Sequence, residues 1–164
     1  MIELLVFDVD GCLSDGKLFY SNNEDECKSF DTRDGFGIVC WHALGKKSAI
    51  ITGKTSKIVE RRAKDLDIKY VFQGVKDKLA VLKELLKELG LELENVAAIG
   101  DDMNDYRQLK SVGWSFAPAD ALPFIRLHVK TVLKSNGGKG AVREMIEMVV
   151  DHENLREEFI KPWL

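Results

Sequence analysis

Short apolar runs that alternate with longer amphipathic segments constrain the fold of this chain most. The runs are apolar almost throughout, as expected of strands that are covered on both faces. We predict such strands at residues 3–7, 48–51, 70–72, 96–99 and 114–117, and an edge strand at 128–132. Apolar residues recur at helical spacing in predicted helices at 56–66, 76–89 and 141–150. Strands that alternate with helices indicate a parallel sheet with helices on both faces.

One section breaks this alternation. Residues 17–20 and 27–30 are predicted strands around a polar turn, so we expect a β-hairpin over about 15–31 that projects from the sheet. The chain contains no repeat, low-complexity tract or long linker. We therefore predict one α/β domain over residues 1–164, a Rossmann-like three-layer sandwich with a central parallel sheet. The tail at about 152–164 is charged with a few apolar residues, and we expect a docking or interface segment there.

Composition and charge argue against several classes of partner. The net charge is −3, and acidic and basic residues are mixed along the chain, so a general nucleic-acid or anionic-membrane surface is not expected. No apolar run approaches the ~20 residues that span a bilayer, and the first residues lack the features of a signal peptide. Three cysteines without CxxC spacing are expected to be reduced thiols. We expect a cytoplasmic protein.

Carboxylates follow two of the predicted strands directly. Asp8 and Asp10 come after the first strand and Asp101 after the fourth, while Thr52 follows the second. Ligands of open α/β sheets bind at the carboxyl ends of the strands, so these side chains are expected to share one rim. Asp8 and Asp10 are two apart and can face one site. Such a carboxylate cluster suits a hard, oxygen-liganded cation such as Mg²⁺.

These residue types match the needs of phosphate-monoester hydrolysis. The reaction requires an oxygen nucleophile, cations on the phosphoryl oxygens and a proton for the leaving alkoxide. A carboxylate can attack directly and form an aspartyl-phosphate, while Thr52 and Lys78 can bind the phosphoryl group. Each motif alone is more often a solvated turn or the first turn of a helix. Their joint occurrence in order, each at or just beyond a predicted strand end, favours the catalytic interpretation.

The four segments Asp8-Val9-Asp10-Gly11, Ile51-Thr52-Gly53, Lys78 and Gly100-Asp101-Asp102 with Asp105 resemble the signature of the haloacid dehalogenase superfamily of phosphatases. The resemblance implies that Asp8 is the nucleophile and Asp10 the general acid/base. It implies a Mg²⁺ ion held by Asp8, by Asp10 through its backbone carbonyl and by Asp101. Asp105 would support those ligands from outside the coordination sphere, and so would Asp102, although it lies beside Asp101 with a similar reach. Thr52 and Lys78 would bind the phosphoryl group.

Longer segments at 14–16, 30–38, 73–78 and 137–144 resemble the 3-deoxy-D-manno-octulosonate (KDO) 8-phosphate phosphatases, which are capless members of that superfamily. The resemblance implies a phosphorylated sugar acid as substrate. It also implies a homotetramer in which the hairpin and the C-terminal region close a neighbouring active site. Neither gap between the first three motifs is long enough for a cap domain. A partner subunit is therefore expected to exclude water from the site.

Substrate-binding positions follow from the same resemblance, and most of them lie in the segment 31–35. Arg33 is the expected partner of the substrate carboxylate, because a guanidinium binds a carboxylate through two hydrogen bonds. This chain has Lys54 and Lys139 where relatives commonly carry Arg, so charge is kept but that paired geometry is not. The complete predicted set is Asp10, Asp31, Thr32, Arg33, Asp34, Gly35, Lys54, Arg62 and Lys78.

Three alternatives stay open at this point. The substrate of the same chemistry could be the 9-phosphate of a nine-carbon sugar acid. A phosphorylatable receiver domain also combines Asp, Mg²⁺, Thr and Lys, but its acceptor Asp follows the third strand and it lacks an acid/base such as Asp10. A catalytically silent tetramerisation module would keep the fold, although no motif residue is missing here.

Overall fold

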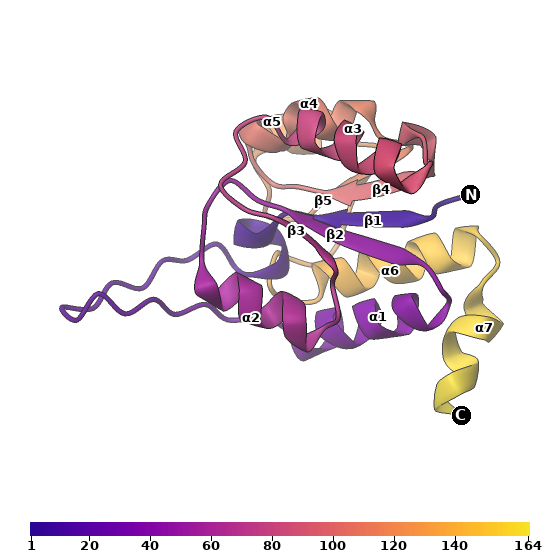
Figure 1. Cartoon of the computed structure of the whole chain (residues 1–164), viewed down its shortest axis with the longest axis horizontal. Helices are drawn as coiled ribbons and strands as arrows, with labels where there is room; N and C mark the ends of the chain where they lie inside the picture. Colours follow the sequence, from indigo (N-terminus) through magenta and orange to yellow (C-terminus); the bar gives the residue numbers. More distant parts are fainter.

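A six-stranded parallel sheet runs through the centre of the molecule (Figure 1). The computed structural model describes residues 1–164. The strand order is β3-β2-β1-β4-β5-β6, which places β1 in the middle, where Phe7 lies opposite both Ile50 and Ile99. The strands are β1 (Leu4–Phe7), β2 (Lys47–Ile51), β3 (Tyr70–Phe72), β4 (Val96–Ile99), β5 (Trp114–Ala117) and β6 (Thr131–Val132). All six predicted strands are confirmed, although β6 is shorter because His128 belongs to the turn that ends the preceding helix.

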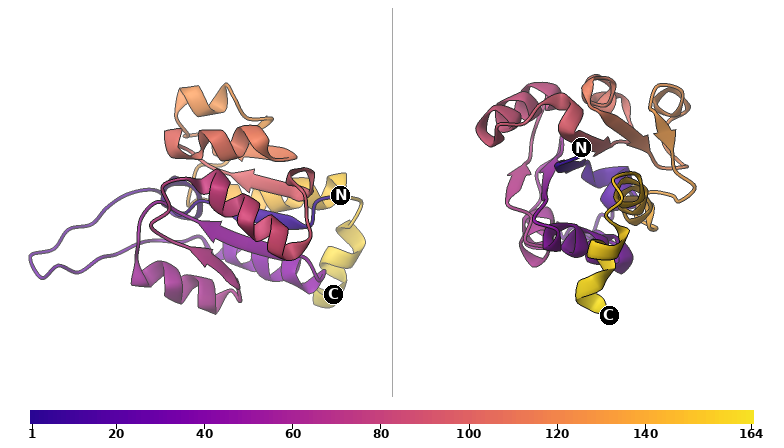
Figure 2. Two further views of the ribbon diagram at one scale, coloured as in Figure 1. Left: turned by 45° about the horizontal axis from the view of Figure 1, so that its top comes forward. Right: turned by 90° about the vertical axis from the view of Figure 1, so that its right-hand side faces the viewer.

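Helices cover both faces of the sheet, as predicted (Figure 2). Successive residues of β1 point to opposite sides, so Leu5 and Phe7 join one apolar cluster and Leu4 and Val6 the other. The first cluster lies under α1, α2 and α6, and the second under α3, α4 and α5. The helices are α1 (Thr32–Ala43), α2 (Lys57–Asp65), α3 (Lys78–Leu89), α4 (Tyr106–Ser111), α5 (Pro123–Arg126), α6 (Ala141–His152) and α7 (Arg156–Ile160).

Helix α1 was not among the predicted helices, because two glycines lower the intrinsic helix propensity of its first half. Packing explains the first of them. A Cβ on Gly35 would lie 2.4 Å from Nη2 of Arg62, which crosses from α2 over the start of α1. Tertiary contact between α1 and its neighbours therefore outweighs the unfavourable local propensity.

The segment over residues 15–31 projects from the body of the molecule, as expected (Figure 1). Its two arms are not strands, however, which corrects the predicted hairpin pairing of 17–20 with 27–30. The one backbone hydrogen bond within the segment joins Glu24 N to Ser21 O at the tip. A two-stranded ribbon without a supporting surface is marginally stable, and residues 17–20 are exposed in the single chain. We call this segment the excursion.

The C-terminal tail folds back onto α1 and α6. Phe159 of α7 is buried in the larger apolar cluster, and Trp163 in the last turn (Lys161–Trp163) lies edge-on to Phe36 of α1 with ring centroids 4.8 Å apart. Ile160, Trp163 and Leu164 keep exposed apolar surface. No helix of the chain has both the length and the apolar character needed to cross a membrane.

Candidate active site

The carboxyl ends of β1, β2 and β4 meet around a pocket of about 260 Å³. None of its lining residues is hydrophobic. The lining residues are Asp8, Asp10, Gly16, Thr52, Gly53, Lys54, Asp101, Asp102 and Asn104. The structure thus brings together the three predicted strand-end motifs at one rim, as the parallel topology requires.

The turn after β1 shapes the floor of this pocket. Gly11 has φ +94°, a conformation that L side chains rarely adopt. A Cβ at this position would also lie 2.0 Å from Oδ2 of Asp101. Glycine therefore allows the loop after β4 to approach the loop after β1 closely enough for the carboxylates of Asp8 and Asp101 to bind one ligand.

Lys78, the first residue of α3, supplies the buried positive charge of the site. Its Nζ donates to Asp8 Oδ1 at 2.7 Å and to Asp105 Oδ1 at 2.6 Å, and its side chain is 1% exposed. Burial alone would lower the pKa of Lys78, but the two carboxylates raise it above its ordinary value. The Asp105 Oδ2 atom accepts from the backbone N–H groups of Asp101 and Asp102. Lys78 and Asp105 together therefore fix the nucleophile candidate and the loop after β4.

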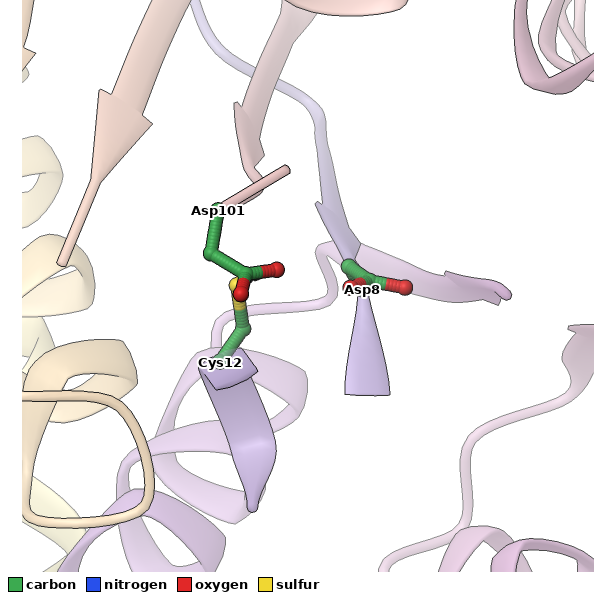
Figure 3. Close-up of side chains that lie close together, drawn as sticks. All are labelled: Asp8, Cys12 and Asp101. Atoms are coloured by element: carbon green, nitrogen blue, oxygen red, sulfur yellow. Dashed lines mark hydrogen bonds between the residues drawn. The ribbon is translucent and has the colours of Figure 1, made fainter. Parts of the chain in front are cut away.

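Asp8 and Asp101 face each other across the pocket floor, with Cys12 beside them (Figure 3). One ligand atom from each lies within 4.8 Å of the others. Burial raises the pKa of Asp8 to about 6, and the negative charge of Asp105 adds to the rise. Burial and the nearby carboxylates raise the pKa of Asp101 to about 8. The site is therefore short of positive charge, which a divalent cation would supply.

The donor set fits Mg²⁺ and not a softer metal. Burial, and the carboxylates around it, raise the pKa of the Cys12 thiol well above its ordinary value, so the sulfur is neutral and lies 4.0 Å from Asp101 Oδ1 as a weak donor. Mg²⁺ prefers oxygen ligands, which Asp8 and Asp101 offer. The carboxylate of Asp10 is not part of this cluster. The family resemblance implies that Asp10 binds the ion through its backbone carbonyl, and this ligand stays a prediction.

The Asp10 carboxylate instead contacts Lys28, a residue that the sequence analysis did not single out. Lys28 Nζ lies 2.6 Å from Asp10 Oδ1, and Glu26 Oε1 lies 3.4 Å from the same ammonium. Burial would lower the pKa of Lys28, but the hydrogen bond and charge of Asp10 raise it, so the side chain is cationic. Lys28 lies in the excursion, just before the segment that carried the family resemblance. Its role depends on the path of the excursion, which the residue pattern does not reveal.

One of the predicted sugar-acid residues lies in the pocket, whereas a second group surrounds the start of α1. Lys54 lines the pocket itself. Asp31 caps α1 through a hydrogen bond from Arg33 N at 2.7 Å, and it also pairs with the exposed guanidinium of Arg33. Thr32 is exposed beside them. Arg62 donates to Asp31 O at 3.4 Å and lies over the ring of Phe30 at 5.4 Å, so it holds the start of α1.

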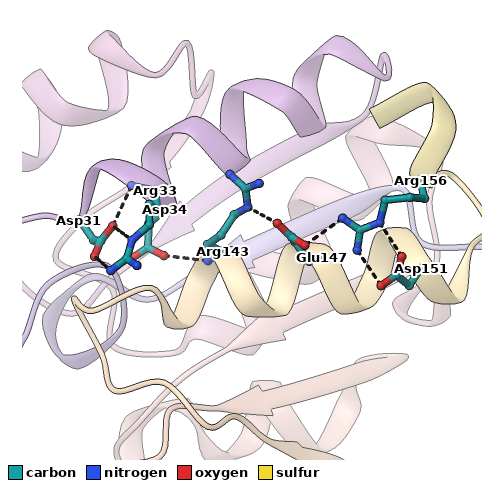
Figure 4. Close-up of polar contacts among 7 residues, drawn as sticks. All are labelled: Asp31, Arg33, Asp34, Arg143, Glu147, Asp151 and Arg156. Carbon is teal, nitrogen blue, oxygen red and sulfur yellow. Dashed lines mark hydrogen bonds and ion pairs between the residues drawn. The ribbon is translucent and has the colours of Figure 1, made fainter. Parts of the chain in front are cut away.

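Asp34 corrects the predicted substrate-binding set (Figure 4). It is 1% exposed, and its Oδ1 accepts from Arg143 N at 2.7 Å in the first turn of α6. Burial raises its pKa to about 6. Gly35 is buried beside it under the guanidinium of Arg62. These two positions join helices and present nothing to the pocket.

Asn104 and the two glycines of the lining, Gly16 and Gly53, were not predicted as site residues. Asn104 lies within the acidic segment after β4, two residues beyond Asp102, and a Cβ on Gly53 would lie 3.3 Å from its Nδ2. Its amide was overlooked because the resemblance rests on the acids of that segment. The spacing of the segment could have indicated it.

Comparison with known proteins gives the family. A model described as haloacid dehalogenase-like hydrolase matches residues 68–146. The 3-deoxy-D-manno-octulosonate 8-phosphate phosphatase KdsC of Escherichia coli K12 is 43% identical over 149 residues, which cover 91% of this chain and 79% of that protein. The chain belongs to the KDO 8-phosphate phosphatase family of haloacid dehalogenase-like hydrolases.

Solved structures of family members agree with this assignment. The phosphatase from Yersinia pestis superposes with a TM-score of 0.93 at 42% identity, covering 95% of this chain and 84% of that one. The phosphatase from Moraxella catarrhalis, solved with magnesium, phosphate and KDO, superposes with a TM-score of 0.95 at 38% identity, covering 99% and 94%. The predicted membership of the haloacid dehalogenase superfamily and of the KDO 8-phosphate phosphatases is confirmed, as is the capless α/β fold.

Proposed function

We propose that this chain is a Mg²⁺-dependent phosphatase that converts KDO 8-phosphate to KDO and phosphate through an aspartyl-phosphate on Asp8. The observation that carries the proposal is that Asp8 lines the pocket while bonded to the buried Lys78 and facing Asp101. The relative from Moraxella catarrhalis was solved with magnesium, phosphate and KDO, which supports the same substrate here.

In the first step Asp8 attacks the phosphorus atom. A bond forms between its carboxylate oxygen and phosphorus while the ester P–O bond to the sugar breaks, and Asp10 gives a proton to the departing alkoxide. Lys78 and Thr52 bind the phosphoryl oxygens at the strand ends. Mg²⁺ held by Asp8, Asp101 and the Asp10 carbonyl supplies positive charge to the phosphoryl group.

In the second step water attacks the phosphorus atom of the aspartyl-phosphate. Asp10, now a carboxylate, takes the proton from that water, and Asp8 leaves as a free carboxylate with release of phosphate. Asp105 keeps Lys78 and the loop after β4 in place throughout, and Asp102 stands at the rim of the pocket. One carboxyl group thus serves as acid and then as base.

We further propose that the sugar acid lies toward the excursion, above the phosphoryl site. Lys54 lines the pocket, and Arg33 extends from α1 with its side chain 73% exposed. An exposed guanidinium outside the pocket suits the carboxylate of a sugar acid. The nine-carbon sugar acid 9-phosphate is the second candidate substrate, because the residues for its carboxylate would be the same.

The assembly of the chain is part of the proposal. The pocket has no cap domain, and the excursion exposes Leu18, Phe19 and Tyr20, with Tyr20 90% exposed. Apolar side chains on a projecting segment are stable when another surface covers them. We propose a cytoplasmic homotetramer of single-domain subunits, residues 1–164, in which excursions and C-terminal tails close neighbouring sites.

A substrate panel tests this function. Initial rates of phosphate release with Mg²⁺ would be compared for KDO 8-phosphate, the nine-carbon sugar acid 9-phosphate and glucose 6-phosphate. We expect the highest kcat/KM for KDO 8-phosphate and complete loss after chelation, with recovery on adding Mg²⁺. A kcat/KM for KDO 8-phosphate no higher than for glucose 6-phosphate would refute the proposed substrate. No Mg²⁺-dependent turnover of any phosphate ester would instead indicate a catalytically silent module.

A further inference from the structure

Lys28 is the one protein partner of the Asp10 carboxylate. Its Nζ donates to Asp10 Oδ1 at 2.6 Å, and the Asp10 side chain makes no other hydrogen bond or ion pair. The Lys28 side chain is 2% exposed although its backbone lies in the projecting excursion, and the Asp10 side chain is 21% exposed. The contact therefore joins the excursion to the proposed acid/base at the edge of the pocket.

Lys28 is itself held in place from a second side. Glu26 Oε1 lies 3.4 Å from the ammonium, and Glu26 Oε2 accepts from Ser56 Oγ at 2.8 Å. Ser56 caps α2 by accepting from Ile58 N, so it belongs to the rigid part of the domain. A continuous set of polar contacts thus runs from the start of α2 through the excursion to Asp10. These contacts fix the position of the Lys28 ammonium, which an exposed lysine side chain would not share.

We propose that Lys28 is a positioning residue for Asp10, an inference that rests on the phosphatase chemistry proposed above. The ammonium occupies Oδ1, so Oδ2 is the oxygen that carries the proton toward the leaving group. When Asp10 transfers this proton to the alkoxide, its carboxyl group gains a negative charge 2.6 Å from the Lys28 ammonium. A fixed cation at that distance stabilises the charge as it develops. Glu26 has the secondary role of orienting Lys28.

A series of aryl phosphates tests this role, because none of them carries a sugar acid. Nitrophenolate leaves phosphorus without needing a proton, whereas unsubstituted phenolate benefits from one. The measured quantity is kcat/KM, which covers the steps up to formation of the aspartyl-phosphate and excludes its hydrolysis. We expect Lys28→Met to lower kcat/KM by less than about threefold for 4-nitrophenyl phosphate and by roughly 10- to 100-fold for phenyl phosphate.

Three further variants sharpen the experiment. Lys28→Arg keeps the charge and an N–H donor and should recover part of the loss with phenyl phosphate. Glu26→Gln should show the same leaving-group dependence more weakly. Lys17→Met removes a lysine from the other arm of the excursion, where the side chain contacts nothing in the site, and should match the wild type. Circular dichroism and thermal melting would establish that each variant is folded.

Two results would overturn the inference. An equal loss across the aryl series would mean that Lys28 binds the phosphoryl group, and a loss confined to KDO 8-phosphate would mean that it recognises the sugar acid. Failure of the proposed function is distinguishable from both. In that case the wild type itself would not release phosphate from KDO 8-phosphate, whatever Lys28 does with aryl phosphates.

Discussion

Three buried or half-buried carboxylates, Asp8, Asp101 and Asp105, lie near one ammonium that bonds to only two of them. Lys78 bonds to Asp8 and to Asp105, but no positive side chain of the chain pairs with Asp101. Burial raises the pKa of both groups, but Lys78 opposes the rise for Asp8, whose pKa is about 6, whereas the pKa of Asp101 is about 8. In the absence of a metal, Asp101 therefore holds a proton at neutral pH. Mg²⁺ has to replace that proton when it binds.

The affinity for Mg²⁺ should consequently increase with pH. Below about pH 6 protons on both Asp8 and Asp101 compete with the ion, and above about pH 8 neither does. We expect the dissociation constant for Mg²⁺ to fall by up to about tenfold per pH unit over this range, one displaced proton being worth that factor. Isothermal titration calorimetry at pH 6, 7 and 8 in buffers of different ionisation enthalpy would measure it.

Asp102→Asn is a matched control for this prediction. Asp102 is exposed at the rim, and the substitution keeps the shape of the side chain. Its affinity for Mg²⁺ should still increase with pH, but over a slightly lower pH range, because the charge of Asp102 contributes to the raised pKa of Asp101. Asp101→Asn should abolish binding. An affinity independent of pH in the wild type would contradict the account of the site charges.

The helices around the site are connected by polar contacts along α6 (Figure 4). Arg143 bonds to Glu147 at 2.6 Å, and Arg156 of α7 bonds to Glu147 at 2.8 Å. These ion pairs are partly exposed and contribute little to the free energy of unfolding. Burial of Phe159, which is 2% exposed, contributes about 1.5–3 kcal/mol and does more to hold α7 against the body.

Asp34 is the exception, because it is buried without a compensating cation. Its pKa of about 6 lies above the ordinary value of 3.8, so the folded state binds this proton more tightly than the unfolded state does. The stabilising contribution of the proton is complete below pH 3.8 and is lost as pH rises through 6. We expect Asp34→Asn to raise the free energy of unfolding at pH 8 by on the order of 1–3 kcal/mol, with no gain at pH 4.

Denaturant unfolding at the two pH values would measure this effect, and Asp31→Asn is the matched control on the same helix. The hydrogen bond from Arg33 holds the pKa of Asp31 below its usual range, so its stabilising contribution is present at pH 8 and is lost on acidification. Asp31→Asn should therefore be destabilising at pH 8. If Asp34→Asn raises the KM for KDO 8-phosphate as much as Arg33→Ala does, the structural role of Asp34 is wrong.

The strands and helices of this fold differ in how far the sequence predicts them. The buried strands are continuous apolar runs and α3 carries a clear apolar period. The topology of a parallel sheet then places Asp8 beside Asp101. Helix α1 has no such period, since Gly35 is required by contact with Arg62 of α2 and Gly37 by contact with Arg143 of α6, which the sequence does not display. The contact of Lys28 with Asp10 depends on the path of an irregular segment. The predicted pairing of 17–20 with 27–30 is wrong because two strand-like runs around a polar turn do not show whether a surface supports the ribbon.

At the scale of the whole molecule, the excursion is the least supported segment. In its first half Phe19 and Tyr20 are 59% and 90% exposed, while in its second half Glu26 and Lys28 contact the body of the domain. A second subunit can therefore cover the first half without disturbing the contacts of Glu26 and Lys28. Burial of two aromatic side chains there would provide several kcal/mol toward association.

If the chain forms the proposed homotetramer, we expect the double variant Phe19→Ser with Tyr20→Ser to form smaller species. Light scattering after size exclusion would measure the mass, and kcat/KM for KDO 8-phosphate should fall together with it because the site loses its cover. Lys17→Ser changes a polar neighbour in the same arm and should leave both unchanged. A double variant that keeps the wild-type mass and activity would contradict the proposed role of the excursion.

The covalent step on Asp8 is the central claim, and trapping it is the most direct test. In Asp10→Asn, attack on 4-nitrophenyl phosphate needs no acid, but hydrolysis of the aspartyl-phosphate lacks its base, so the intermediate should accumulate. Rapid quench and peptide mass spectrometry should find a burst of nitrophenolate approaching one per subunit and one phosphoryl group on the peptide that carries Asp8. Asp8→Asn should show neither. A phosphoryl group on any other residue, or turnover without a phosphorylated peptide, would contradict the account.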